Sequence, residues 1–320
     1  MKDGHGMSRN RAGLAVLTLS FLLLLAGCGG GNRQAEETRY VVGVVTKSGS
    51  SEYWMSIRRG METAADEAGM ELVILSPDSE DREDIQGKMA ETLVERDVDV
   101  IAVSPINSFG RPEYFDMAEE KGIPIVSYDT GFADLDVPYI GIDNRQAGAA
   151  MAEHLAEALD HRGEVGLVTG GLEQLSHRQR MEGFLDCMED EKNMRLVFIE
   201  SGYSNLQMSE VKIRRIMNAH PLIEGIAATS AVTALGIAEG LEKDAVKIVS
   251  IDIQKDSVEA VRDGRITALI EQSGYDIGCR TIQYIEKLRN GTADPLGEIL
   301  DAGVLTEDNA ADYIERNYQE

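Results

Sequence analysis

Short apolar runs alternate with longer stretches of helical periodicity along most of the chain. The run 41–46 (VVGVVT) is apolar at nearly every position, which is typical of a strand buried on both faces of a parallel sheet. Apolar residues then recur at helical spacing across 54–68, and Gly69 follows as a helix stop. Further strands are predicted at 72–75, 98–103 and 123–127, and a further helix at 85–94. This alternation predicts right-handed βαβ units and an α/β fold with parallel sheets.

The chain repeats this pattern. Four segments recur later in the sequence in the same order: 42–46 as 165–169, 59–62 as 180–183, 99–104 as 224–229, and 125–129 as 248–252. The common order predicts two α/β lobes of like topology. Parallel sheets place ligands at the carboxyl ends of their strands. Asp129 and Asp252 end the last pair of repeats, so we expect them on opposite walls of one cleft.

The first 28 residues have the pattern of an export signal rather than of a folded segment. A basic start precedes an almost unbroken apolar stretch at 14–25, and small residues lead directly to Cys28. Roughly a dozen apolar residues suit the core of a signal peptide and are too few to span a bilayer. Because small residues before a cysteine are similar to the lipobox of bacterial lipoproteins, we expect a signal peptide at 1–27, a diacylated Cys28 and a flexible tether at 28–39. An ordinary secretory signal and a short membrane anchor are the alternatives.

Length and composition exclude several classes of protein. The chain has 320 residues, 43% of them hydrophobic, which is enough for roughly two domains with a sizeable core. Its formal net charge of −25 argues against a nucleic-acid partner, because phosphate binding requires clustered Lys and Arg. The five histidines lack close metal-ligand spacing, and the sequence has no nucleophile elbow, so we expect no metal, no cofactor and no catalytic residue. Cys187 and Cys279 are expected as separate thiols in different lobes.

Aromatic and acidic residues near the predicted strand ends are the first candidates for ligand binding. Tyr53 and Trp54 are adjacent, so both cannot face the core of one helix, and aromatic faces suit the C–H faces of a sugar ring. Alternatively, Trp54 begins the apolar stripe of its helix. Asp129 and Asp252 are two-pronged acceptors for neighbouring hydroxyls, or else helix caps or solvated carboxylates. Paired carboxylates also suit a glycosidase, but the repeat accounts for both residues.

Charged and polar residues complete the candidate set. Arg178 and Arg180 suit vicinal hydroxyls or a carboxylate, or else form a surface pair. Gln272 follows the predicted strand 266–271 and is placed to reach the cleft from a crossover. Lys47 ends the first strand, where it indicates either a ligand with a carboxylate, phosphate or borate-like diol, or a solvent-facing lysine. Secondary candidates are Ser51, Ser104, Thr130 and Ser230.

Motifs that cover nearly the whole chain after Tyr40 resemble the type I periplasmic solute-binding proteins, most closely their ribose- and galactose-binding branch. They are Tyr53-Trp54 ahead of 56–60 (SIRRG), 122–129 (GIPIVSYD), 142–144 (IDN), 178–184 (RQRMEGF), 219–221 (AHP), 234–236 (ALG) and 251–252 (ID). The resemblance implies two Rossmann-like lobes, joined by a three-crossover hinge near Asp143, Gly274 and residue 300, that close on a small ligand. It implies a first lobe of 40–143 plus 275–299 and a second lobe of 144–274 plus 300–320.

The resemblance also implies roles for individual residues. Tyr53 and Trp54 match the ring-stacking aromatics of the family, and Asp129 and Asp252 match its two hydroxyl-binding aspartates. Arg180 matches the ligand-binding arginine, and Gln272 the hinge glutamine. Two positions depart from the pattern, since ribose binders commonly have arginine where Thr130 stands and asparagine where Ser230 stands. These departures are compatible with a monosaccharide ligand but argue against ribose itself.

The resemblance and the leader together imply an exported solute receptor. It would be a monomer, anchored by lipid to the outer face of the cytoplasmic membrane, that delivers a monosaccharide-like ligand to the permease of an ABC importer without catalysis. The alternatives are a sensor subunit of the same fold for a histidine kinase or chemoreceptor, and a binder of a nucleoside or furanose signalling molecule. The leader argues against a cytoplasmic sugar-responsive repressor. A lipid-anchored enzyme is a further alternative, for which the sequence shows no catalytic motif.

Overall fold

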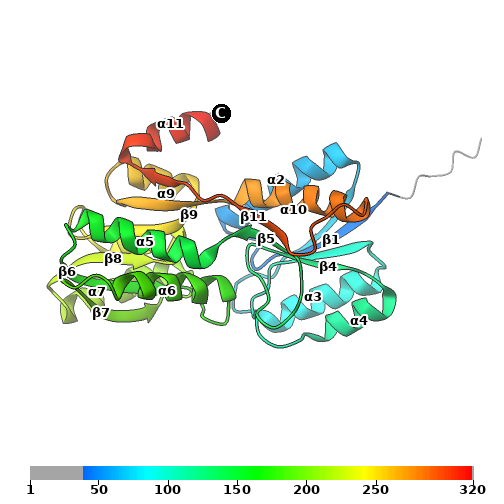
Figure 1. The fold of residues 1–320 in the computed structure, drawn as a ribbon, viewed down its shortest axis with the longest axis horizontal. Coiled ribbons are helices and arrows are strands. Elements are labelled where there is room, and N and C mark those ends of the chain that lie inside the picture. Colours follow the sequence, from blue (N-terminus) through cyan, green and yellow to red (C-terminus); the bar gives the residue numbers. More distant parts are fainter. Residues whose placement is uncertain (1–38, 319–320) are drawn as a thin grey trace, which may run out of the picture. The chain divides into compact units, whose positions relative to one another are not determined.

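Two six-stranded sheets form the framework of the molecule (Figure 1). The computed structural model describes residues 39–318. The first sheet has the order β11-β5-β4-β3-β1-β2, and all of its strand pairs are parallel. Its strands are β1 (Val41–Val45), β2 (Glu71–Leu75), β3 (Val100–Val103), β4 (Ile125–Tyr128), β5 (Tyr139–Ile142) and β11 (Gly297–Leu300). The predicted signal peptide, Cys28 and most of the predicted tether lie outside the described residues.

The second sheet repeats the order of the first. Its order is β12-β10-β9-β8-β6-β7, and only the pair of β10 with β12 is antiparallel among the described strands of this sheet. Its strands are β6 (Gly163–Thr169), β7 (Met194–Ser201), β8 (Ile223–Ala228), β9 (Lys247–Ile253), β10 (Ala268–Ser273) and β12 (Val304–Thr306). The repeated segments fall on β1 and β6, β3 and β8, and β4 and β9, so the predicted internal repeat is a repeat of structure.

Helices cover both faces of each sheet, which is why the strands are apolar on both sides. On the first sheet, α2 (Glu52–Ala68) and α10 (Gly274–Arg289) pack on one face, and α3 (Glu83–Glu95) and α4 (Glu113–Lys121) on the other. On the second, α5 (Asn144–Ala158) and α6 (Leu175–Met188) pack on one face. The other face carries α7 (Leu206–Ala219), α8 (Ala231–Gly240), α9 (Lys255–Arg262) and α11 (Glu307–Asn317). Within the described range, no helix has the length and apolar character of a membrane span.

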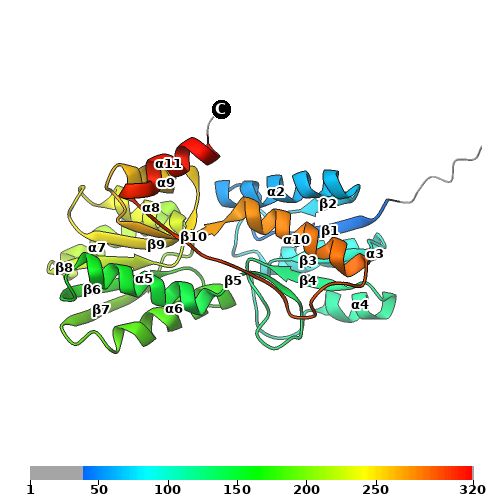
Figure 2. The ribbon, with the colours of Figure 1, turned by 45° about the horizontal axis from the view of Figure 1, so that its top comes forward.

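The chain crosses between the two sheets three times. It passes from β5 to α5, from β10 to α10, and from β11 to β12. Figure 2 shows the last crossing as the red segment that leads toward α11. The expected fold class, two Rossmann-like lobes joined by three crossovers, is therefore confirmed. Cys187 lies in α6 and Cys279 in α10, and both are free thiols.

Glycines allow pairs of helices to approach closely in each lobe. A Cβ on Gly60 of α2 would lie 2.0 Å from the carbonyl oxygen of Tyr275 in α10. In the second lobe, a Cβ on Gly183 of α6 would lie 1.9 Å from the carbonyl oxygen of Arg145 in α5. A Cβ on Gly148 of α5 would lie 2.0 Å from the carbonyl oxygen of Arg180, so this contact also fixes the backbone that carries a candidate site residue.

We expect Gly183→Ala to lower the free energy of unfolding by about 1–3 kcal/mol, because the new methyl group overlaps the backbone of α5. Thermal and urea denaturation would measure the loss. Gly87→Ala in α3 is the matched control, since a Cβ there meets no atom within 4 Å. It should leave stability unchanged or raise it, because alanine favours a helix over glycine. Equal stabilities of the two variants would contradict the close contact between α5 and α6.

Candidate ligand-binding site

Asp129 and Asp252 occupy equivalent places in the two lobes. Asp129 follows β4 and Asp252 lies near the end of β9, as the repeat predicted. Both have a left-handed backbone, with φ of 61° and 81° respectively, which aspartate tolerates better than most residues. Neither is a helix cap in the structure, because the helices that follow begin at other residues. Both carboxylates line one pocket between the lobes.

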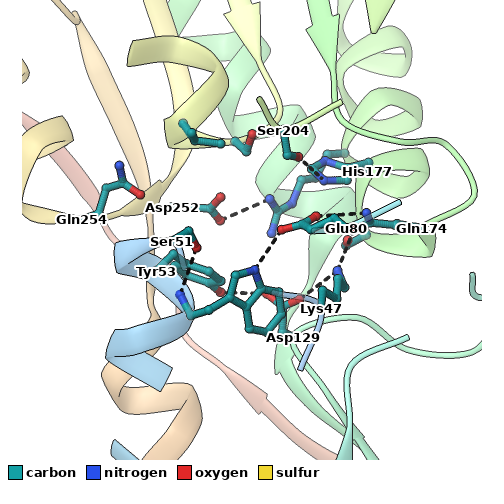
Figure 3. Close-up of a pocket in the computed structure, with 15 residues that line it drawn as sticks. Lys47, Ser51, Tyr53, Glu80, Asp129, Gln174, His177, Ser204, Asp252 and Gln254 are labelled. Atoms are coloured by element: carbon teal, nitrogen blue, oxygen red, sulfur yellow. Dashed lines mark hydrogen bonds and ion pairs between the residues drawn. The ribbon is translucent and has the colours of Figure 1, made fainter. Parts of the chain in front are cut away.

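This pocket lies where the carboxyl ends of the two sheets meet (Figure 3). Eight of the sequence-predicted residues line it, namely Lys47, Ser51, Tyr53, Trp54, Asp129, Arg180, Ser230 and Asp252. The remaining lining residues are Glu80, Gln174, Ser176, His177, Ser204, Val232 and Gln254. The lining therefore combines aromatic side chains with a high density of donors, acceptors and charges.

Asp129 is the most heavily bonded group of the site. Its Oδ1 accepts from the Tyr53 hydroxyl at 2.7 Å and from Gln272 Nε2 at 3.0 Å. Its Oδ2 accepts from Ser104 Oγ at 3.0 Å, from Thr130 Oγ1 at 3.1 Å and from Lys47 Nζ at 3.1 Å. Burial acts to raise the pKa of Asp129, but the charges of Lys47 and Arg180 outweigh it and lower the pKa to about 2. The carboxylate stays ionised, and its five donors fill the roughly four lone-pair sites that it offers.

Asp252 is less fully compensated. It accepts from Arg180 Nη1 at 3.2 Å and is 8% exposed. Burial raises the pKa of Asp252 to about 6. The charge of Arg180 lowers this pKa, but the nearby negative charge of Asp129 raises it and offsets part of that effect. A hydrogen bond with the Ala231 backbone, at the start of α8, also lowers the pKa of Asp252, so two donors meet the roughly four lone-pair sites of this carboxylate and leave capacity for a ligand hydroxyl.

Arg180 presents one remaining donor to the pocket. Its Nε donates to Asn144 Oδ1 at 2.8 Å, and Nη1 donates to the Thr229 carbonyl at 2.8 Å and to Asp252. Its Nη2 donates to Gln272 Oε1 at 2.8 Å. A guanidinium group has five N–H bonds, so four are engaged within the described chain and one on Nη2 is left. Burial lowers the pKa of Arg180, but Asp252 and Asp129 outweigh it and raise the pKa, so the group stays charged.

The aromatic residues have both packing and polar roles. Trp54 is 3% exposed, and its ring packs edge-on against Tyr53 and Tyr128. Its Nε1 donates to Glu80 Oε1 at 2.8 Å. Tyr53 directs its hydroxyl to Asp129 and accepts from Gln272. Trp54 thus belongs to the core of its lobe and also lines the pocket, where its contact with a ligand stays a prediction.

Four predicted residues do not line the pocket. Ser104, Thr130 and Gln272 lie behind it and hold the Asp129 carboxylate by hydrogen bonds. The structure places Arg178 outside the pocket, because its guanidinium donates to the Leu172 carbonyl and lies 4.2 Å from the ring centre of Phe109. Phe109 belongs to the first lobe and Arg178 to the second, so this contact joins the lobes.

Sequence reasoning missed several residues of the second lobe. Gln174, Ser176 and His177 lie in the segment that begins α6, which corresponds in the repeat to the segment around Tyr53 at the start of α2. Carrying the repeat through this segment would have found them. Burial, followed by the charges of Arg180 and Lys47, lowers the pKa of His177 well below its usual range, so its imidazole is neutral. Glu80 has no counterpart among the predicted motifs.

The family of periplasmic binding protein domains matches residues 42–293 of the chain. The chain belongs to this family. It is similar to the D-ribose/D-allose-binding protein of Pseudomonas aeruginosa, with 26% identity over 78% of this chain and 82% of the relative. It is also similar to the ribose import binding protein of Escherichia coli, with 23% identity over 86% of this chain and 93% of the relative.

Among solved structures, it is similar to an ABC transporter periplasmic solute-binding protein from Actinobacillus succinogenes with bound D-allose. The two share 25% identity with a TM-score of 0.81, over 86% of this chain and 100% of the other.

The low pKa of Asp129 predicts how the stability of this binding domain depends on pH. Its ordinary pKa of 3.8 is lowered to about 2 on folding, so the ionised carboxylate stabilises the fold above pH 3.8 and this stabilisation is lost as pH falls toward 2. Asp129→Asn leaves the Lys47 charge buried without its partner. We expect it to cost about 3–5 kcal/mol at neutral pH.

Denaturation of wild type and Asp129→Asn at pH 7 and pH 5 would test this dependence. The stability difference should persist at pH 5, because the wild-type carboxylate remains ionised there. If the difference disappeared between pH 7 and pH 5, Asp129 would titrate above its ordinary range rather than below it.

Proposed function

We propose that the protein is an exported solute-binding protein that captures a monosaccharide between its lobes and delivers it to an ABC importer. The observation that carries this proposal is the pocket itself, in which the Asp252 acceptor and the remaining Arg180 donor lie beside the aromatic rings of Tyr53 and Trp54. Each sugar hydroxyl both donates and accepts, and the C–H faces of the ring suit an aromatic wall. The relatives named above, which bind ribose or allose, support the same class of ligand.

The charges of the pocket also suit a sugar without net charge. Two cations, Lys47 and Arg180, stand against three carboxylates, Asp129, Asp252 and Glu80, so the lining has about one excess negative charge, which disfavours an anionic ligand. Asp129 anchors Tyr53 and Lys47, whereas Asp252 has fewer partners and so has lone pairs left for the ligand. Closing the lobes on a sugar would remove these groups from water, which strengthens each polar contact. Binding and release require no bond to be made or broken.

We expect Asp252→Ala to weaken sugar binding by at least about 2 kcal/mol, because it removes the acceptor of a ligand hydroxyl. Calorimetry with D-ribose, D-allose and D-arabinose would measure the affinities. The change in intrinsic fluorescence would report on Trp54, the single tryptophan of the chain. Asp66→Ala, on an exposed position of α2, is the control and should bind as the wild type does. Unchanged affinity in Asp252→Ala would place the ligand elsewhere.

The lipid anchor and the monomeric state belong to the same proposal, and the sequence supports the anchor. The apolar stretch at 14–25 and the small residues before Cys28 support a lipoprotein signal. An anchor on the outer face of the membrane would keep the receptor near its permease. Two acyl chains suffice for stable attachment, where one chain is marginal.

Cys28→Ala should block processing of the leader or release the protein from the membrane fraction, because it removes the thiol that carries the diacyl group. Fractionation of bacteria that express the full chain, with immunoblotting of each fraction, would test this. Cys187→Ala is the matched control, since that thiol lies in α6 and should not affect the membrane fraction. Membrane attachment that is the same in both variants would contradict lipidation.

A further inference from the structure

The N-terminus of α6, in the second lobe, is capped by a residue of the first lobe. The N-cap residue of α6, Gln174, makes no side-chain hydrogen bond to the start of the helix. The first N–H of α6, on Leu175, donates to Oγ of Ser108 at 2.9 Å. Ser108 is buried in the loop between β3 and α4. Its own N–H donates to the carbonyl of Glu173 at 2.9 Å, so this one residue holds both ends of the turn into α6.

A second helix of the second lobe shows the same arrangement. The first N–H of α9, on Lys255, donates to Oε1 of Glu52 at 3.0 Å. Glu52 is the first residue of α2 in the first lobe. Its carboxylate therefore stands at the N-termini of two helices, whose macrodipoles both favour a negative charge. We call the contacts of Ser108 with Leu175 and of Glu52 with Lys255 the cross-lobe caps.

The internal repeat shows that the cap of α6 is unusual for its position. The helices α2 and α6 follow the equivalent strands β1 and β6 of the two lobes. In the first lobe, Ser51 caps α2 from within the same lobe, because its Oγ accepts from the Trp54 N–H at 3.3 Å. In the second lobe, the equivalent position is Gln174, which makes no such bond. Ser108 therefore supplies from the other lobe the acceptor that α6 lacks in its own.

The pocket lies between the two cross-lobe caps. In Figure 3, Gln174 and Gln254, which precede the capped residues, lie on opposite sides of it. Inside the pocket, Lys47 is 3% exposed and donates to Gln174 Oε1 at 2.6 Å, so it is not a solvent-facing lysine. The cavity there has a volume of about 50 Å³, enough for a few waters, so these side chains must move when a sugar enters. Ser108 and Glu52 do not line the pocket, and they bind main-chain N–H groups, so a sugar need not break either cap.

The cross-lobe caps exist only while the two lobes are together. When the lobes separate, the N–H groups of Leu175 and Lys255 lose these acceptors and bond to water instead. The loss of one helix cap shifts an equilibrium about fivefold. A protein whose binding-competent state is only partly populated binds its ligand more weakly in proportion to that population. Both caps therefore act on affinity through closure of the lobes, without touching the ligand.

We propose that Ser108 and Glu52 are positioning residues that stabilise the closed arrangement of the lobes through the cross-lobe caps, and so set the affinity for the ligand and its rate of release. The inference rests on the proposed function, because closure around a ligand is what the caps stabilise. It adds two residues that lie outside the pocket and that no sequence motif included.

The test removes each cap separately in the full chain, with Ser108→Ala and Glu52→Ala, and measures binding of D-ribose, D-allose and D-arabinose by calorimetry. Each variant should bind every sugar that wild type binds about fivefold more weakly, by the same factor for each sugar, because neither side chain meets the ligand. Stopped-flow fluorescence of Trp54 should show this loss mainly as faster release, since the caps break when the lobes open. Glu52→Gln keeps an acceptor oxygen and should recover part of the affinity.

Two matched controls remove similar groups that act within the second lobe. Asp256→Ala removes an exposed carboxylate from the first turn of α9, the helix that Glu52 caps. Ser209→Ala removes a buried hydroxyl that donates to the Asn205 carbonyl in the same lobe. Both controls should bind sugars as wild type does. An equal loss in the controls, a loss that differs from sugar to sugar, or unchanged affinity in either cap variant would overturn the inference.

Small-angle X-ray scattering separates the inference from the proposed function. Wild type that binds none of the three sugars, while thermal denaturation shows it folded, contradicts the proposed function. The radius of gyration of the chain without sugar then decides the inference: a larger radius in both cap variants than in wild type and the controls supports it, and equal radii overturn it. Sugar binding by wild type that is unchanged in the cap variants contradicts the inference and leaves the proposed function intact.

Discussion

The negative charge of Asp129 lies inside the molecule, and the arrangement of the site follows from the need to compensate it. A buried carboxylate is costly unless cations and hydrogen-bond donors surround it. Lys47 supplies the cation. The donors are Tyr53 from α2, Ser104 and Thr130 from the segments that follow β3 and β4, and Gln272 from the end of β10. The buried Lys47 ammonium also needs an acceptor for each of its N–H bonds, and Gln174 from the second lobe accepts one of them.

The two lobes share one strand order, but their equivalent aspartates have different electrostatic environments. Asp129 and Asp252 share a left-handed backbone at equivalent strand ends. Asp129 meets five donors, one of them the Lys47 ammonium, and the charges of Lys47 and Arg180 lower its pKa to about 2. Asp252 meets one cation, Arg180, and the backbone of Ala231, and burial raises its pKa to about 6. A duplicated scaffold thus holds one carboxylate that organises the protein and one that has capacity left for a ligand.

The positions of the site residues depend on contacts that lie far from the pocket. Arg180 is held by Asn144, at the start of α5, and by close packing of its backbone against Gly148. Tyr139 links the same network to the first lobe, because its hydroxyl accepts from Asn144 and donates to the Asp129 carbonyl. The crossover from β5 to α5 therefore contributes directly to the geometry of the guanidinium group.

The sequence by itself determined the fold class, the duplication and both aspartates, because buried parallel strands are apolar throughout and their carboxyl ends form the ligand edge. Motifs close to those strand ends also predicted Tyr53, Trp54 and Arg180, which line the pocket. Only the tertiary structure decided that Lys47 is neutralised internally, that Arg178 lies outside the pocket, and that Gln174 and Glu80 complete the wall. The reason is physical: strand ends follow from local periodicity, whereas the partner of a buried charge is chosen by whichever group from the other lobe comes within hydrogen-bond distance.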